Sequence, residues 1–285
     1  MVRRLWLASL VFFIVGVLAT MYGQSRENRI VDGLVDTLMQ GAGQSVGGGN
    51  VDFNTFSTLP VPVARYFKHV LMNGQPLIAQ AKIRQSGELR SDTVNENWYP
   101  FTASHLTVPP VTGFAWIAKA GTPFASHLRV LDSYRDGAGA SRVSLYSAFN
   151  LGSDQDSPEL NAATLQRYLA EAVWAPTALL PQFGVAWTEI DDTAALATLS
   201  VKDTTVSLEF RFNQRGEVTS VYTPARFRLV DGGYKAQPWE GRFSDYQLQS
   251  GMKVPHSAVA GWLEEGVLKE VWRGNLVKVQ YKIVM

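Results

Sequence analysis

The 285-residue chain contains no cysteine, and this absence excludes disulfides, thiolate metal ligands and cysteine nucleophiles. It also lacks an excess of charge, because 26 Lys and Arg residues stand against 25 Asp and Glu residues and leave a net charge of +1. A chain without a basic field has little to attract a phosphate backbone, so we expect no nucleic-acid partner. The common catalytic signatures are missing as well: there is no G-x-S-x-G, no H-E-x-x-H and no P-loop.

Residues that could bind a metal are few and scattered. The four histidines, His69, His105, His127 and His256, stand alone, without the i,i+4 spacing of a helical metal site. They could still converge in space, but isolated histidines are more typical of surfaces or of hydrogen-bonded positions. The segment SDQDSPE, residues 153–159, lacks the glycine of a calcium loop. The sequence therefore predicts no metal and no cofactor.

The N-terminus carries one long uncharged run. Arg3 and Arg4 precede residues 5–22, and the next charged residue is Arg26. The run approaches the roughly 20 residues that a spanning helix needs, and the arginines before it favour a cytoplasmic N-terminus. A cleaved signal peptide is the alternative, but the end of the run offers no small-residue cleavage site. We therefore expect residues 1–22 to be an uncleaved single-pass anchor in the inner membrane, with the rest of the chain on the extracytoplasmic, periplasmic side.

Two segments connect this run to the body of the chain. Residues 25–40 place Ile30, Leu34 and Leu38 at helical spacing, which predicts a short amphipathic helix. Residues 41–50, GAGQSVGGGN, are typical of a flexible tether. The predicted organisation is an anchor at residues 1–22, a helix and tether at residues 23–58, and a single β-rich domain at residues 59–285.

The body is rich in predicted strands. The clearest is TVSLEFRFN, in which Val206, Leu208, Phe210 and Phe212 alternate with polar residues, as in a half-buried antiparallel strand. No parallel βαβ rhythm is present. Further strands are predicted at residues 81–89, 114–119, 194–201, 239–248, 254–262 and 275–283, and hairpin loops at residues 134–142 and 213–217.

One helix interrupts these strands. It begins with Ser157 as a cap and Pro158 in its first turn, and it ends where Trp174 runs into Ala175 and Pro176. An antiparallel sheet with a few helices packed on one face is the fold that this pattern predicts. The fold class is therefore α+β.

A single carboxylate, Glu171, stands near the end of this helix. It lies away from the apolar stripe and four residues after Arg167, so a solvated ion pair is the plain interpretation. Because Trp174 and Leu160 share the side of the helix that carries Glu171, the helix could also be covered on both faces. A carboxylate held there has to be paired or protonated, and it is then a candidate binding or acid–base group.

The chain is rich in tryptophan, with eight residues. Several stand in short signatures, such as ENWYPFTA, PPVTGFAWIAK, WEGRFSDY and VWRGN. A tryptophan in a sheet is usually a core residue. Several together could equally wall an apolar cavity, because curved antiparallel sheets often hold one small hydrophobic ligand. The pattern alone leaves both interpretations open.

The motifs RYLAEAVWAPTALLP, PWEGRFSDY and WRG together resemble a bacterial family that is classified as a domain of unknown function. Matching stretches run from Leu59 to Tyr281 and thus cover the whole body. One departure is the residue before the tryptophan of VWRGN, where family members often carry tyrosine. The resemblance implies that the residues of the helix motif, together with an aspartate in the DSY motif, matter beyond packing: Asp132, Glu171, Trp174, Pro176 and Thr177.

By a looser analogy the chain is similar to proteins of the lipoprotein-carrier type, which have a half-barrel fold. This similarity implies a curved antiparallel sheet wrapped over helices, with an apolar groove between them.

The first functional hypothesis is a membrane-anchored module that binds an apolar ligand, a lipid or acyl group, between the sheet and the helix. Glu171, with Arg167 or Arg242, would hold a polar head, while Trp174 and Trp116 would line the site for the tail. Asp132, Thr177 and Trp239 complete the set of candidate ligand-binding residues.

Two hypotheses from other classes stay open. The first is a hydrolase-like acid–base enzyme that uses Glu171 and Asp132 with a histidine brought near them by the fold. It requires these groups to surround one concave site. The second is an interaction domain of an envelope assembly, which would be marked by an exposed apolar patch rather than by a cavity.

Overall fold

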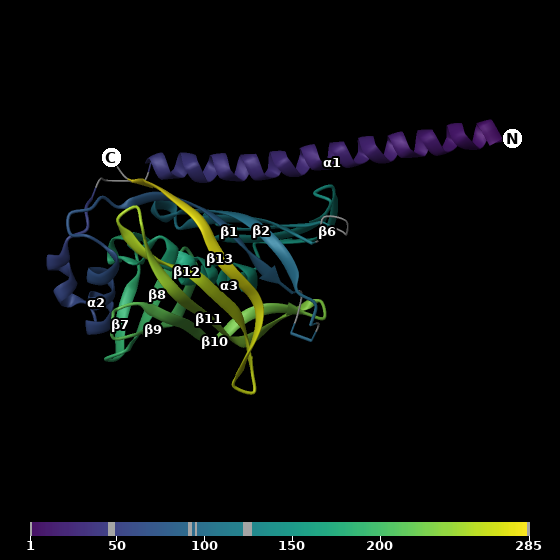
Figure 1. Ribbon diagram of the computed structural model, residues 1–285. Coiled ribbons are helices and arrows are strands. Elements are labelled where there is room, and N and C mark those ends of the chain that lie inside the picture. The colour runs from purple at the N-terminus through teal and green to yellow at the C-terminus, as the bar shows by residue number, and fades with distance from the viewer. Residues whose placement is uncertain (1, 45–48, 91–92, 95, 122–126, 284–285) are drawn as a thin grey trace.

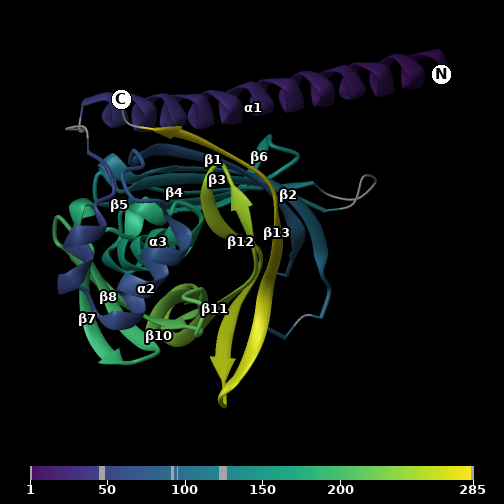
Figure 2. The ribbon, with the colours of Figure 1, turned by 60° about the vertical axis from the view of Figure 1, so that its left-hand side comes forward.

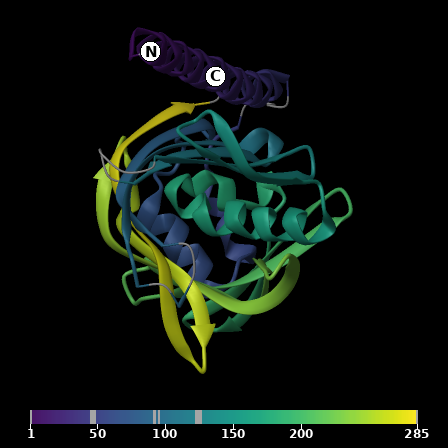
Figure 3. The same cartoon turned by 90° about the vertical axis from the view of Figure 1, so that its right-hand side faces the viewer.

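A computed structural model describes residues 2–44, 49–90, 93–94, 96–121 and 127–283 of the chain (Figure 1). These residues form a large, curved, open antiparallel sheet with a few helices. The sheet wraps around helix α3 (Pro158–Glu171), which Figure 3 shows enclosed by the strands. The α+β class and the curved antiparallel sheet that we predicted are confirmed.

The described sheet contains thirteen strands in the order β6-β5-β4-β3-β2-β1-β13-β12-β11-β10-β9-β8-β7. Two meanders, one on each side of α3 in the chain, are joined where β1 pairs with β13. The strands are β1 (Ile78–Leu89), β2 (Tyr99–Val108), β3 (Gly113–Ala120), β4 (Leu128–Arg135), β5 (Ala138–Leu145), β6 (Phe149–Gln155), β7 (Ala186–Asp191), β8 (Ala194–Val201), β9 (Thr204–Phe212), β10 (Val218–Val230), β11 (Gly233–Gln249), β12 (Met252–Glu264) and β13 (Val267–Ile283).

Period-two alternation decides which face of each strand is buried. In β9 the four apolar residues predicted to share a face, Val206, Leu208, Phe210 and Phe212, are all buried, while Arg211 is exposed. Because the sheet is strongly curved, its concave side encloses one continuous core that also takes in α2 (Val61–Val70) and α3. The concave side is therefore the place where an internal site can form.

Helix α3 begins and ends as the sequence predicts. The Ser157 side chain accepts a hydrogen bond from the Leu160 amide, and Pro158 occupies the first turn. A 3-10 turn at Ala172–Trp174 follows, and the chain leaves the helical direction before Pro176. The helix packs against β4 and β5 of the first meander and against β9 and β10 of the second, so the sheet covers two of its sides. Figure 2 shows α3 within the same curve.

Helix α1 (Val2–Gln44) is one continuous helix that runs along the outer, convex side of the sheet (Figure 1). Leu38 and Ala42 are buried against residues of β2 and β3. Glu27, nearly fully buried, accepts hydrogen bonds from Arg142 of β5, the shortest at 2.6 Å. Helix α1 therefore lies on the opposite face of the sheet from α2 and α3, the helices of the body, which share the concave face.

The boundaries in this region differ from the predicted ones. The helix includes the first residues of the predicted tether and continues to Gln44, and residues 45–48 of the tether lie outside the described part of the chain. Asn50 already pairs with Pro76, and Val51 is buried in the main core. The structure therefore places residues 50–58, which we assigned to the linking segment, in the folded body.

The predicted transmembrane anchor is wrong. Among the residues that the structure describes, no helix is both long enough and apolar enough to cross a membrane. The predicted location, a single-pass protein of the inner membrane with its C-terminal domain in the periplasm, is wrong for the same reason.

Candidate functional site

A row of polar and aromatic side chains crosses the concave face of the first meander. The strand register places His105 of β2 opposite Trp116 of β3, Trp116 opposite Asp132 of β4, and Asp132 opposite Ser141 of β5. Residues that are directly opposite in an antiparallel pair have neighbouring side chains on the same face. The register therefore brings together residues that lie up to 36 positions apart in the sequence.

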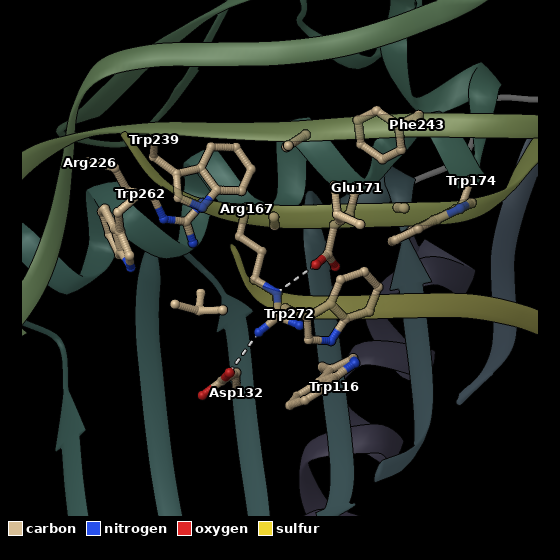
Figure 4. Close-up of a pocket in the computed structure, with 16 residues that line it drawn as sticks. Trp116, Asp132, Arg167, Glu171, Trp174, Arg226, Trp239, Phe243, Trp262 and Trp272 are labelled. Carbon is tan, nitrogen blue, oxygen red and sulfur yellow. Dashed lines mark hydrogen bonds and ion pairs between the residues drawn. The ribbon is translucent and has the colours of Figure 1, made fainter. Parts of the chain in front are cut away.

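Helix α3 lays two charged side chains over this row. Arg167 donates from Nε to Glu171 Oε1 at 2.8 Å and from Nη1 to Asp132 Oδ2 at 2.6 Å. Its guanidinium also lies 4.6 Å from the centre of the Trp116 ring. The ion pair between Arg167 and Glu171 is thus the one predicted from their i,i+4 spacing, and Asp132 extends it into a three-residue cluster, which we call the Arg167 cluster (Figure 4).

The Arg167 cluster forms part of the wall of a cavity of about 250 Å³ between α3 and strands of the second meander. Five of the eight tryptophans line this cavity: Trp116, Trp174, Trp239, Trp262 and Trp272. Figure 4 shows their indoles arranged around Arg167 and Glu171. We refer to this space as the aromatic cavity. Most of the tryptophans noted in the sequence therefore line a cavity rather than only filling the core.

Small residues at the centre of the sheet keep this space open. Gly241 of β11 pairs with Ala260 of β12, and this small pair lies next to the aromatic pair Trp239–Trp262. A Cβ at Gly241 would stand 3.0 Å from the Trp239 ring, so any larger residue there would displace the indole. The alternation of large and small pairs therefore produces the cavity.

Burial sets the ionisation of the groups around the cluster. Burial lowers the pKa of His105 to about 4, although the nearby Glu171 carboxylate partly offsets the effect. The imidazole is therefore neutral at pH 7, and its Nε2 lies 3.5 Å from Glu171 Oε2. Burial also lowers the pKa of Arg167, but Glu171 and Asp132 outweigh this effect and raise that pKa above its ordinary value.

Three buried polar atoms of the cavity lining have no hydrogen-bond partner among the described residues. They are the donors Arg226 Nη1 and Trp272 Nε1 and the acceptor Glu171 Oε2. Buried polar atoms are nearly always hydrogen-bonded in native proteins. By contrast, the indole of Trp174 donates to the Pro255 carbonyl, and that of Trp116 donates to Gln85. The unpartnered atoms are therefore the places where a bound molecule could make polar contacts.

Six of the eight candidate residues named from the sequence line the aromatic cavity: Trp116, Asp132, Arg167, Glu171, Trp174 and Trp239. Thr177 lies elsewhere in the core and accepts a hydrogen bond from the Ile78 amide at the start of β1. Arg242 is more than half exposed and pairs with Glu240. These two are the candidates that the structure keeps away from the cavity.

Sequence reasoning did not find Arg226 or Trp262, which also line the cavity. Phe243 also lines the cavity, and its position gives a simple signal, because it follows Trp239 and Gly241 at a spacing of two and therefore shares their face. Arg226 gave no such signal, since an arginine in a strand is expected to face solvent.

No group of three or more His, Asp and Glu side chains in the described part of the chain could hold a metal ion. The site is therefore characterised by indoles, one buried imidazole and four charged side chains: Asp132, Arg167, Glu171 and Arg226.

Fold and site together define a protein with a curved antiparallel sheet that encloses a tryptophan-lined cavity next to a buried charge cluster. The chain belongs to the family of unknown function DUF6544, whose model matches residues 50–274. This result confirms the family membership that the sequence motifs indicated. A search of curated proteins found no match to the chain.

Two solved structures are similar to this one. The first is a LolA superfamily protein from Nitrosomonas europaea, at 11% identity, with a TM-score of 0.38, and the similarity covers 82% of this chain and 96% of that chain. The second is a β-barrel-like protein of the DUF1849 family from Brucella abortus, at 10% identity and a TM-score of 0.22, covering 73% of this chain and 99% of that chain.

Proposed function

We propose that this protein binds a small hydrophobic molecule, a lipid or an acyl compound, in the aromatic cavity between α3 and strands β11–β13. The observation that carries the proposal is the cavity itself, which is walled mainly by indoles and alanines and bordered on one side by the Arg167 cluster. Ligand sites are typically concave and mostly apolar, with a few polar groups that fix orientation.

Packing supports this proposal. Protein interiors are close-packed, and voids much larger than a water molecule are few. Tryptophans surround the space of about 250 Å³, so an apolar molecule bound there would make dispersion contacts with their rings and remove apolar surface from water. Gly241 and Ala260 maintain the space at the cost of core packing, and this arrangement is expected when the space has a use.

The polar side of the cavity supports a ligand that is not purely hydrocarbon. Glu171 uses Oε1 to bind Arg167, while its Oε2 has no hydrogen-bond partner among the described residues. A ligand hydroxyl or amide that donates to this oxygen would satisfy it. A hydrogen bond to a charged group contributes about 1.5–3 kcal/mol, so Glu171 would then contribute strongly to affinity.

The first test compares the full-length protein with its Glu171→Gln variant by native mass spectrometry of co-purified small molecules. We expect the wild type to retain a lipid-like mass and the variant to retain roughly tenfold less, because it weakens the hydrogen bond to the ligand. Glu189→Gln is the matched control, since Glu189 is exposed on β7, and it should retain as much as the wild type. Wild-type protein that carries no ligand and takes up none of a series of added lipids would contradict the proposal.

A second test fills the cavity. Ala260→Leu adds three carbon atoms beside Gly241, and we expect it to lower the affinity for hydrophobic ligands at least tenfold by occupying their space. Tryptophan fluorescence provides the titration signal. Ala236→Leu, at an exposed position of β11, is the control and should bind like the wild type. Equal affinities for both variants would show that ligands bind elsewhere.

The same geometry bears on the enzyme hypothesis. Glu171 and Asp132 meet at Arg167, and His105 lies close to Glu171, so the fold does bring the three groups together. A general acid or base must reach the substrate, however, and His105 does not line the aromatic cavity. Both carboxylates are also bound to the same guanidinium. The arrangement therefore supports ligand binding better than acid–base catalysis.

A further inference from the structure

A second, wider cavity opens beside the aromatic cavity. It has a volume of about 650 Å³ and runs between α3, β5, the edge strand β6, and β10. Four residues line both spaces: Asp132, Arg167, Arg226 and Trp262. We call the second space the outer groove. The aromatic cavity and the outer groove therefore meet at these four side chains.

Two arginines at this junction have no anionic partner. Arg226 and Arg228 are separated by one residue on β10, so both side chains lie on the same face of the strand, and both line the outer groove. Arg226 lies over the Trp239 ring at 4.6 Å, and Arg228 lies over the Trp262 ring at 5.2 Å. Neither guanidinium forms an ion pair with a described residue, and Arg226 Nη1 is buried without a hydrogen-bond partner.

The acids near these arginines are already engaged. Asp132 accepts hydrogen bonds from Arg167 and from Ser141. Asp154, across the groove on β6, accepts one from the Tyr234 hydroxyl. Burial and then the like charge of Arg167 lower the pKa of Arg226 to about 10, so the side chain is still a cation at pH 7. Glu171 and Asp132 partly offset this effect, but both are bound directly to Arg167, so an anion that binds the Arg226 guanidinium would add a direct ion pair.

We propose that the ligand is an amphipathic anion whose carboxylate or phosphate group binds Arg226 and Arg228, while its apolar part occupies the aromatic cavity. The inference rests on the proposed function and adds the charge of the ligand and the position of its head group. Arginine forks match the oxygens of carboxylates and phosphates, and the indoles beneath them hold both guanidinium planes in place.

The test compares three probes of one chain length, decanoate, decanol and decyltrimethylammonium, in fluorescence titrations of the full-length protein. We expect the wild type to bind decanoate about ten to a hundred times more tightly than decanol, as a charge-assisted hydrogen bond predicts, and the cation least tightly. In Arg226→Met the preference for decanoate, measured as the ratio of its affinity to that of decanol, should fall to about twofold or less. Arg228→Met should reduce the preference in the same direction.

Arg242→Met is the matched control, because Arg242 is on β11 but outside both cavities, and it should keep the full preference for decanoate. Two results would overturn the proposal that the ligand is an anion and leave hydrophobic binding intact. The first is equal binding of decanoate and decanol by the wild type. The second is a preference for decanoate that persists in both Arg226→Met and Arg228→Met. Tighter binding of decyltrimethylammonium than of decanoate would also overturn the proposal that the ligand is an anion. If none of the three probes binds, the proposed function itself fails, and the inference fails with it.

Discussion

Replacing Arg167 with methionine is expected to lower the free energy of unfolding by about 3 kcal/mol. Arg167 separates two carboxylates, Glu171 and Asp132, and binds both. Removing one partner of a buried ion pair typically costs about 3–5 kcal/mol, because the remaining charge is left uncompensated. The lower end applies here, since the three side chains are 16–20% exposed and keep some hydration. The variant leaves two negative groups close together, and methionine preserves the apolar contact with Trp116.

Urea unfolding followed by tryptophan fluorescence measures this effect. Arg211→Met is the control, because Arg211 also pairs with a glutamate but is 53% exposed, and the loss should stay below about 1 kcal/mol. The triple variant Arg167→Met, Asp132→Asn, Glu171→Gln should recover most of the stability, since no charge of the Arg167 cluster itself is left unpaired. If Arg167→Met costs no more than Arg211→Met, or if the triple variant is as unstable as the single one, the cluster is not a coupled ion-pair network.

Local patterns were sufficient to predict part of this site. Glu171 and Arg167 are four residues apart on a helix, and that spacing alone predicts their ion pair. The helix start at Ser157 and the buried face of β9 likewise follow from capping and alternation. Each of these features depends on residues that are close in the sequence.

The third member of the cluster could not be derived from local patterns. Asp132 reaches Arg167 because the register of β3 and β4 places it opposite Trp116, and register is decided by pairing across the whole sheet. The same limit applies to Arg226, which faces inward because the sheet curls back over α3. An arginine between Ala225 and Phe227 gives no local sign of that curl.

Two misjudged features had different causes. Arg242 was proposed as a ligand residue although Trp239, Gly241 and Phe243 alternate around it, so the period of two already placed it on the other face. For α1, residues 1–22 and residues 25–40 were treated as separate segments, whereas the structure joins them in one helix that continues to Gln44, with Leu38 and Ala42 buried against the sheet. Tertiary contacts of this kind do not appear in a hydropathy profile.

The buried imidazole of His105 should make the protein sensitive to acid. In the folded state burial lowers the pKa of His105 from 6.5 to about 4, whereas in the unfolded chain it returns to about 6.5. As the pH falls below 6.5, His105 binds a proton in the unfolded chain but not in the folded protein. The free energy of unfolding therefore decreases between pH 6.5 and pH 4 and levels off below pH 4. A difference in pKa of this size corresponds to about 3 kcal/mol.

The measurement is the free energy of unfolding in urea at a series of pH values from 7.5 to 4, for the wild type and for His105→Gln. The two proteins share every other titratable group, so the difference between the two curves isolates the imidazole. We expect the wild type to lose about 3 kcal/mol more than the variant over this interval. His127→Gln is the control, because His127 is exposed, and its curve should follow that of the wild type. If His105→Gln loses stability as steeply as the wild type, the imidazole is already charged in the folded state. It would then pair with Glu171 rather than lie neutral beside it.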